Sequence, residues 1–228
     1  MIFVSVILPT KSEILLWRKI HLQIMQDYWR VIVGIGKVFA AICAEAMILK
    51  FDVDCVINIG VAGTLCKELG VMDVAVADQV VQHDMNTSAL GDPIGLLSGL
   101  NQVFLPSDEK MRTLLCSCLQ DKGIHYEVGT IATGDLFLHK ETQKALLHER
   151  FNAIAGEMEG GSIGHVCFVN KVPFAILRSI SDGEGGAMDY QTFAEKAALQ
   201  SIEVVKEFCN TKAFIHKTKP FRMPISIF

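Results

Sequence analysis

Short apolar runs rich in β-branched residues alternate along this chain with longer segments whose apolar residues recur every three or four positions. The short runs, which predict strands, read FVSVIL, VIVGI, DCVINIG, DVAVADQVV, YEVGTIATG and PFAILRSIS. The longer segments predict helices over residues 12–26, 37–50, 107–121, 140–148, 159–170 and 192–209. Nearly continuous apolar strands with helices between them are typical of a mostly parallel or mixed sheet covered on both faces. We therefore expect an α/β fold of three layers, in which a central mixed, twisted sheet lies between helices.

Length and composition favour one folded unit. The chain has 228 residues, half of them hydrophobic, and a mean hydropathy of +0.35. Single domains can run to roughly 250 residues before they split, and the chain shows neither an internal repeat nor a low-complexity linker. We expect a single domain over residues 1–228, with a C-terminal tail of unassigned role from about residue 211, where Pro220 and Pro224 oppose further helix.

Charge and cysteine usage exclude several classes of function. The net charge is −4 and no run of Lys or Arg occurs, so binding to nucleic acid or to an anionic membrane is not expected. The apolar start MIFVSVILP is too short for a membrane span and lacks the features of a signal peptide. The seven cysteines form no C-x-x-C pair and are expected to be reduced thiols of a cytoplasmic protein. Because metal-ligand spacing and a dinucleotide fingerprint are both missing, neither a metal nor another cofactor is expected.

Several strands stop at a glycine or an acidic residue, in the sequences INIGVAG, ATGDLF, AGEMEGG and SISDGEGG. In sheets of this class the ligand lies beyond the strand ends that share an edge. Gly60 and Gly63 permit close approach of the backbone to a flat ligand, although their spacing alone is a weak signal. Phe137 and Leu138 follow a strand, where an aromatic ring is placed to cover a base, although such residues are more often core.

The stretch SISDGEGG carries Asp182 at the end of an apolar strand, with Ser181 before it and glycines behind it. The glycines leave little bulk around the carboxylate, which makes it available at the rim of a site. Asp followed by Gly is also common in surface turns. From this motif alone we favour the surface turn.

The stretch GEMEGGSIGHV sets Glu157 and Glu159 one residue apart, with Met158 between them, where a strand gives way to a helix. Acidic residues complement the positive end of a helix dipole, and the glycines permit close packing of helix on sheet. Each glycine costs a helix about 1 kcal/mol relative to alanine, so three of them require a packing or ligand reason. A carboxylate here is also placed to accept hydrogen bonds from two vicinal hydroxyls, such as those of a ribose.

These motifs occur in an order that resembles the 5′-methylthioadenosine/S-adenosylhomocysteine nucleosidases of the nucleoside phosphorylase superfamily. The blocks similar to those of the family are GIGKVFAA, INIGVAGTL, EMEGGSIGHVC and VPFAILRSISD, with the pair His83 and Asp84 and the stretch TSALGD among them. The resemblance runs from Gly34 to about Ser201. It implies a nucleoside phosphorylase-like fold and an enzyme, a hydrolase acting on N-glycosyl bonds, that assembles as a homodimer.

The resemblance also implies the reaction and the residues that perform it. Water would cleave the bond between adenine and ribose in 5′-methylthioadenosine and S-adenosylhomocysteine, with 5′-deoxyadenosine as a further candidate substrate. Asp182 matches the general acid that protonates N7 of the purine. Glu159 matches the residue that binds the 2′- and 3′-hydroxyls, with Met158 packed on the sugar and Glu157 beside them. The other substrate-binding residues implied are Ile35, Val61, Gly63, Phe137, Leu138, Ser181 and Tyr190.

Two segments depart from the pattern of the family. In LPTKSEI, Glu13 corresponds to the glutamate that activates water, with Thr10 in place of the usual methionine. In QHDMNTSALGD, Leu90 stands where the family has an aromatic residue. That region shapes the pocket for the 5′ substituent and, in dimeric members, packs on the neighbouring subunit. The preferred 5′ substituent is therefore left open.

Three other functions stay open. A nucleoside phosphorylase would use phosphate in place of water, but it requires an arginine cluster or a basic loop, and Arg178 is expected to pair with an acid such as Glu157. A non-catalytic relative would bind a nucleoside without cleaving it. A related nucleosidase would act on another purine nucleoside, such as futalosine, with Asp182 in the same role.

Overall fold

The structure is a computed structural model that describes residues 2–6, 28–51, 53–183 and 187–211. Its strands are β1 (Ile2–Val6), β2 (Tyr28–Ile32), β3 (Cys55–Thr64), β4 (Val74–Gln82), β5 (Phe104–Pro106), β6 (Tyr126–Thr133), β7 (Ala153–Glu157) and β8 (Phe174–Asp182). Its helices are α2 (Lys37–Phe51), α3 (Glu109–Asp121), α4 (Glu141–Phe151), α5 (Gly160–Asn170) and α6 (Ala187–Asn210), with a short 3-10 helix, η1 (Ser88–Leu90). The predicted helix over 12–26 and the tail over 212–228 lie outside the described residues.

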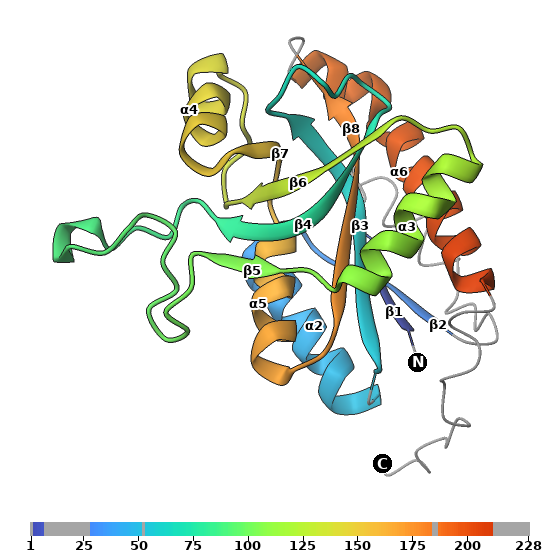
Figure 1. The fold of residues 1–228 in the computed structure, drawn as a ribbon, viewed down its shortest axis with the longest axis horizontal. Helices are drawn as coiled ribbons and strands as arrows, with labels where there is room; N and C mark the ends of the chain where they lie inside the picture. Colours follow the sequence, from blue (N-terminus) through green and yellow to red (C-terminus); the bar gives the residue numbers. More distant parts are fainter. Residues whose placement is uncertain (1, 7–27, 52, 184–186, 212–228) are drawn as a thin grey trace.

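The described strands form one mixed sheet. Its order is β2-β1-β3-β7-β6-β4-β5, and β8 pairs with both β3 and β4. Strand β3 is antiparallel to β7, and β4 is antiparallel to β5 and β8, whereas the other neighbours are parallel. Because β8 joins β3 to β4, the strands β3, β7, β6, β4 and β8 close into a ring that β1, β2 and β5 extend (Figure 1).

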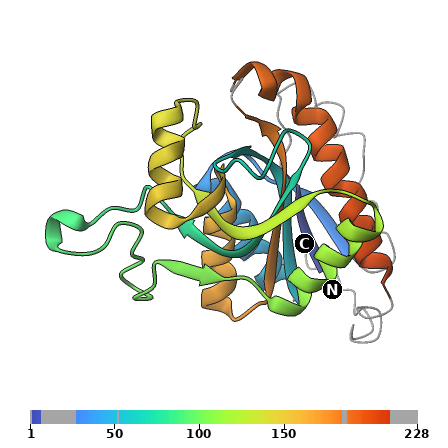
Figure 2. The same ribbon diagram turned by 45° about the horizontal axis from the view of Figure 1, so that its top comes forward.

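Helices cover both faces of the sheet. Along β4, Val74 and Val76 pack with residues of α3 and α6, whereas Ala75 and Ala77, which alternate with them, pack with residues of α2 and α5. This alternation is the two-residue period of a strand that is buried on both sides. Figures 1 and 2 show α2 beside α5 and α3 beside α6. The predicted three-layer α/β fold is confirmed.

The elements differ from the predicted ones mainly at their ends. Two strands, β5 and β7, lie outside the predicted runs. Strand β5 has only three residues, which are too few to show an alternating pattern, and β7 reads AIAGE, in which small residues largely replace the usual β-branched ones. Helix α6 begins at Ala187 and not at residue 192. All seven cysteines lie among the described residues and are free thiols, as predicted. None of the described helices is both long and apolar enough to cross a membrane.

The pairing register brings four strand ends to one place. Gly63 near the end of β3 pairs with Asp182 on β8 and with Gly156 on β7. Thr133 at the end of β6 pairs with Glu157 at the end of β7. A Cβ atom at Gly63 would lie 2.7 Å from Oδ2 of Asp182, so any other residue at this crossing would displace the Asp182 carboxyl group. The acidic motifs that are far apart in sequence therefore meet at one edge of the ring.

Candidate active site

A cavity of about 360 Å³ opens at this edge of the sheet. Of the twelve residues that the sequence predicts for the site, eleven line it and one, Glu13, lies outside the described residues. The lining residues are Ile35, Val61, Ala62, Gly63, Leu136, Phe137, Leu138, Gly156, Glu157, Met158, Glu159, Ser181, Asp182 and Tyr190. Sequence reasoning missed Ala62, Leu136 and Gly156, each of which is adjacent to a residue that it did select.

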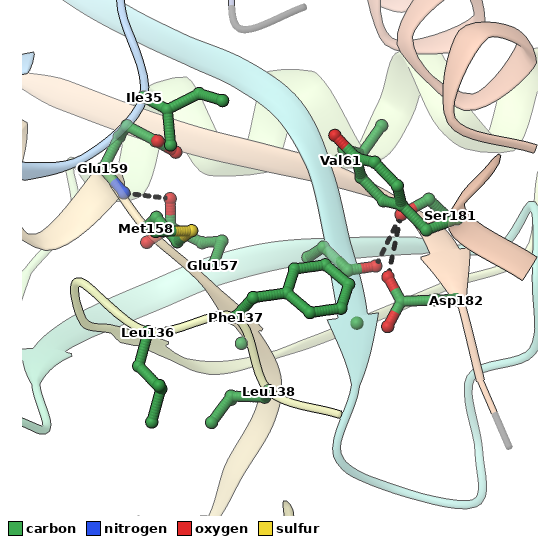
Figure 3. Close-up of a pocket in the computed structure, with 14 residues that line it drawn as sticks. Ile35, Val61, Leu136, Phe137, Leu138, Glu157, Met158, Glu159, Ser181 and Asp182 are labelled. Carbon is green, nitrogen blue, oxygen red and sulfur yellow. Dashed lines mark hydrogen bonds between the residues drawn. The ribbon is translucent and has the colours of Figure 1, made fainter. Parts of the chain in front are cut away.

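The polar groups stand at opposite ends of the cavity. Figure 3 shows Glu159, Met158 and Ile35 at one end and Ser181 and Asp182 at the other, with Phe137 between them. Phe137 and Tyr190 meet edge to face, with ring centroids 5.5 Å apart and an interplanar angle of 77°. Phe137 is 38% exposed, so it is a wall of the cavity and not a core residue.

Asp182 is only 2% exposed, so the surface turn favoured from its motif is wrong. The fully buried strand β8 carries the side chain to the cavity, where the Ser181 hydroxyl donates a hydrogen bond to Oδ1 at 3.0 Å. Burial raises the pKa of Asp182 above its ordinary value, although the Ser181 hydrogen bond opposes this change. The carboxyl group therefore keeps its proton to higher pH than an exposed aspartate does.

Glu157 is held by hydrogen bonds to three parts of the fold. Its Oε1 accepts from the Thr133 hydroxyl, and its Oε2 accepts from the Arg178 guanidinium and from the backbone N–H groups of Glu159 and Gly160. The Arg178 side chain is fully buried and also donates to Asn58. The predicted pairing of Arg178 with Glu157 is confirmed. Because both oxygens of Glu157 are occupied, this carboxylate orients the start of α5.

Glu159 lies 3% exposed just before α5, with its carboxylate toward the start of α2. Its Oε1 accepts from the Gly36 N–H at 2.8 Å, and its Oε2 lies 3.8 Å from Nη2 of Arg178. Burial, and after it the charge of Glu157, raise the pKa of Glu159 to about 7, against the opposing effects of Arg178 and the Gly36 N–H. Because this pKa lies close to neutral pH, a nearby positive charge that attracts the carboxylate only modestly is enough to keep Glu159 ionised there.

The glycines of GEMEGGSIGHV serve close packing. A Cβ atom at Gly161 would lie 2.8 Å from the Thr133 side chain. The backbone N–H of Gly161 donates a hydrogen bond to the Thr133 hydroxyl at 2.6 Å. A Cβ atom at Gly164 would lie 3.0 Å from Phe174 and Val80. The cost of glycine in α5 is thus offset by the close seating of the helix on the sheet.

A closed set of hydrogen bonds joins the start of α2 to the loops after β4 and β6. The Lys37 N–H donates to Asp135 at 2.8 Å, the Asp135 N–H donates to Asp84 at 2.9 Å, and the Lys37 ammonium donates to Asp84 at 2.6 Å. Burial acts to raise the pKa of Asp84, but its bonds to Lys37 and Asp135 hold that pKa below its ordinary value. These contacts fix the start of α2, next to the Gly36 N–H that donates to Glu159. In the sequence, Asp84 is named as part of a motif, whereas Lys37 and Asp135 occur only within the blocks GIGKVFAA and ATGDLF.

Among the described residues, no cluster of three or more His, Cys, Asp or Glu side chains is arranged to hold a metal ion. The site instead combines a buried carboxyl group, a second carboxylate at the far end, and apolar and aromatic walls. Such a cavity, at a shared edge of strand ends in an α/β fold, has the position and lining of a small-molecule binding site.

Comparison with known proteins identifies the family. The model of the phosphorylase superfamily matches residues 26–210, and the chain belongs to this superfamily. The aminodeoxyfutalosine nucleosidase of Campylobacter jejuni is 39% identical over 177 residues, 77% of each chain. The 5′-methylthioadenosine/S-adenosylhomocysteine nucleosidase of Aeromonas salmonicida is 36% identical over 176 residues, 75% of this chain and 76% of that protein.

A solved structure gives the same result. The Helicobacter pylori MTAN variant with 5′-methylthioadenosine in its active site superposes with a TM-score of 0.82 and 30% identity, over 92% of this chain and 97% of that one. The relatives are nucleosidases, which are hydrolases of N-glycosyl bonds, so the predicted enzyme class is confirmed.

Replacing Glu159 by Gln should make the stability difference between variant and wild type depend on pH. The folded wild type holds the Glu159 proton up to about pH 7, whereas the unfolded chain loses it near 4.5. The free energy of unfolding of the wild type should therefore fall, relative to Glu159→Gln, as pH rises through this window, and the difference should be constant above it.

Urea unfolding at a series of pH values measures this difference. Glu149→Gln, which removes an exposed carboxylate of α4, is the control for the loss of one charge. A difference between wild type and Glu159→Gln that is the same at every pH would contradict the raised pKa.

Proposed function

We propose that this protein hydrolyses the N-glycosidic bond of 5′-methylthioadenosine and S-adenosylhomocysteine and so releases adenine. The observation that carries this proposal is the pair of buried carboxyl groups, Asp182 and Glu159, at opposite ends of one apolar cavity. A purine nucleoside presents a basic nitrogen at one end and two vicinal hydroxyls at the other, which are the groups that these two side chains are suited to bind.

Asp182 is the general acid of the proposed reaction. Adenine leaves poorly as an anion, so cleavage of the bond from C1′ to N9 requires a proton at N7 of the base. Asp182 supplies it, since burial raises its pKa and keeps the carboxyl group protonated to higher pH. Proton transfer by a positioned acid typically contributes roughly 10²–10⁴ in rate. Ser181 fixes the orientation of the carboxyl group by its hydrogen bond.

Glu159 is the group that binds the ribose hydroxyls. As the base departs, the sugar becomes cation-like, and a nearby fixed carboxylate stabilises that charge. The approach of the cation also favours ionisation of a carboxyl group whose pKa is about 7. Met158 packs on the sugar, and Glu157 with Arg178 keeps Glu159 in place.

The apolar walls hold the adenine ring. Phe137 and Tyr190 form an aromatic corner beside Asp182, and Gly63 leaves room for a flat base next to the strand. Ile35, Val61 and Leu138 complete the wall. Exclusion of water by these side chains strengthens the electrostatic interactions of both carboxyl groups.

Water, and not phosphate, is the proposed nucleophile, and Glu13 is its proposed base. Acid and base must lie on opposite faces of the sugar to leave room for water. None of the fourteen lining residues is cationic, and the guanidinium of Arg178 is already bound to Glu157, so the described part of the cavity offers no cluster of cations for phosphate.

A second candidate is hydrolysis of aminodeoxyfutalosine. It is favoured by the Campylobacter jejuni relative, which carries that name and is 39% identical to this chain. Both reactions would use Asp182 and Glu159 in the same roles and would differ at the 5′ substituent. Leu90, in the segment whose counterpart shapes the 5′ pocket of the family, is 83% exposed on η1 and does not line the described cavity.

Assembly as a homodimer is also part of the proposal. Helix α2 buries Ala40, Ala44 and Met47 against the core, yet its opposite side is apolar as well. A surface helix with two apolar sides is typical of an element covered by another chain. We propose a second copy as the cover, placed beside Ile35 at the cavity rim. The exposed apolar residues of this surface are Ile35, Val38, Phe39, Ile42 and Leu49.

Sedimentation equilibrium tests the dimer. The wild type should sediment as a dimer, and Ile42→Asp, which puts a charge on a side chain that is 63% exposed, should sediment as a monomer. The control Leu199→Asp changes an exposed leucine of α6 and should stay dimeric. A wild type that is monomeric at the concentrations of the activity assay would contradict a second copy as the cover of α2.

Release of adenine measures the substrate range directly. Purified protein in buffer without phosphate should release adenine from 5′-methylthioadenosine and S-adenosylhomocysteine, and kcat/KM for aminodeoxyfutalosine and 5′-deoxyadenosine ranks the alternatives. Strict dependence on phosphate would identify a phosphorylase instead. Binding of these nucleosides without any release would identify a non-catalytic relative.

Asp182→Asn should lower kcat by at least roughly 10²-fold, because the amide cannot supply the proton. Affinity for a non-hydrolysable adenosine analogue, measured by calorimetry, should change little, and the exposed Asp121→Asn is the control for loss of one charge. Near-normal turnover by Asp182→Asn would show that the acid is another residue. The same assay with Glu13→Gln tests the proposed water base.

A further inference from the structure

Lys144 is a buried cation that lies outside the cavity lining. It sits on α4 and is 4% exposed, although lysine is rarely buried without a specific partner. Its ammonium donates a hydrogen bond to the carbonyl oxygen of Gly183 at 2.7 Å and lies 3.5 Å from Oε1 of Glu141. The Glu141 side chain is 70% exposed, so the half-buried Gly183 carbonyl is the main partner that compensates the lysine.

Gly183 is held from its other side as well. Its N–H donates to Oδ2 of Asp189 at 3.2 Å, and Asp189 belongs to the first turn of α6. Gly183 directly follows Asp182 in the chain. The residue next to the proposed acid is therefore fixed between a cation from α4 and a carboxylate from α6, and these two charges lie near Asp182 without lining the cavity.

We propose that Lys144 and Asp189 are positioning residues that fix Gly183, next to Asp182 at the end of β8, and bias the protonation of Asp182 in opposite directions. This inference rests on the proposed function, in which Asp182 donates a proton to the base. Lys144 favours the ionised form of the acid by attraction, and Asp189 favours the protonated form by repulsion. Neither residue touches the substrate, so each acts through Asp182.

The described groups around Asp182 change its pKa in opposite directions. Burial is the largest cause of its raised pKa. The Ser181 hydrogen bond on β8 and the Lys144 charge on α4 lower that pKa, whereas the Asp189 charge on α6 raises it. On strand β3, the residue paired with Asp182 is Gly63, and its lining neighbours Val61 and Ala62 carry no charge either. Removal of the Lys144 charge should therefore raise the pKa of Asp182, and removal of the Asp189 charge should lower it.

Two substitutions isolate the two charges. Lys144→Met keeps an unbranched apolar stem and removes the ammonium, and Lys144→Arg retains a cation. Asp189→Asn removes the negative charge, but its amide oxygen still accepts the hydrogen bond from Gly183. Lys140→Met removes a cation from an exposed position next to the start of α4, and it is the control for net charge.

The first readout is the pH profile of kcat/KM for adenine release, whose alkaline limb reports the acid of the free enzyme. This limb should move to higher pH in Lys144→Met and to lower pH in Asp189→Asn. It should stay at the wild-type position in Lys140→Met and return toward that position in Lys144→Arg. A role in folding alone would lower kcat without moving the limb.

The second readout is titration of the ligand-free protein by NMR, with ¹³C-labelled aspartate carboxyl groups and Asp182 assigned from Asp182→Asn. This titration follows the proton of Asp182 without any turnover. It therefore tests the inference even if the wild type releases no adenine. Absence of adenine release would overturn the proposed function, but it would leave this test intact. Folded variants whose Asp182 titrates as in the wild type would overturn the inference. Should Lys144→Met fail to fold, the titration of Asp189→Asn decides the question: a downward shift supports the inference and no shift overturns it.

Discussion

The ion pair between Glu157 and Arg178 is the interaction on which the site depends. Both side chains are buried, and removal of one partner from such a pair typically costs roughly 3–5 kcal/mol, because the other charge is left without compensation. The Glu157 carboxylate also accepts from the N–H groups that begin α5 and from Thr133 on β6. The direction of α5, and with it the position of Glu159, is therefore fixed by a group that is itself anchored to β8.

Much of this arrangement could be predicted from the sequence, since it is encoded locally. Strand ends marked by glycine and acid pointed to Asp182, Glu157 and Glu159, and the alternation of apolar runs with helical segments predicted the layers of the fold. The burial of Asp182 was not evident, because the pattern of Asp before Gly is the same in a surface turn and in a buried strand end. Only the pairing of β8 with β3 distinguishes the two, and this pairing joins distant segments.

Other parts of the site depend on contacts that no local pattern reports. Lys144 occurs in ETQKALLHERF, where a lysine reads as an ordinary solvated residue of a helix. It is buried because α4 lies near the end of β8, so that its ammonium reaches the Gly183 carbonyl. Lys37, Asp84 and Asp135 likewise meet only because the start of α2 lies between two loops of the sheet. Polar residues that support a site are thus harder to predict than those that line it.

The two carboxyl groups of the cavity show how one fold can assign opposite tasks to similar side chains. Both have raised pKa values because both are buried. Glu159 accepts from the Gly36 N–H just before α2 and lies near the guanidinium of Arg178, and both favour its ionised form. Asp182 receives a single hydroxyl hydrogen bond and has charges of both signs nearby, so its protonated form is opposed less. Because the proposed reaction needs one group ionised and the other protonated at the same pH, the surroundings of each carboxyl group, and not its chemical type, decide its role.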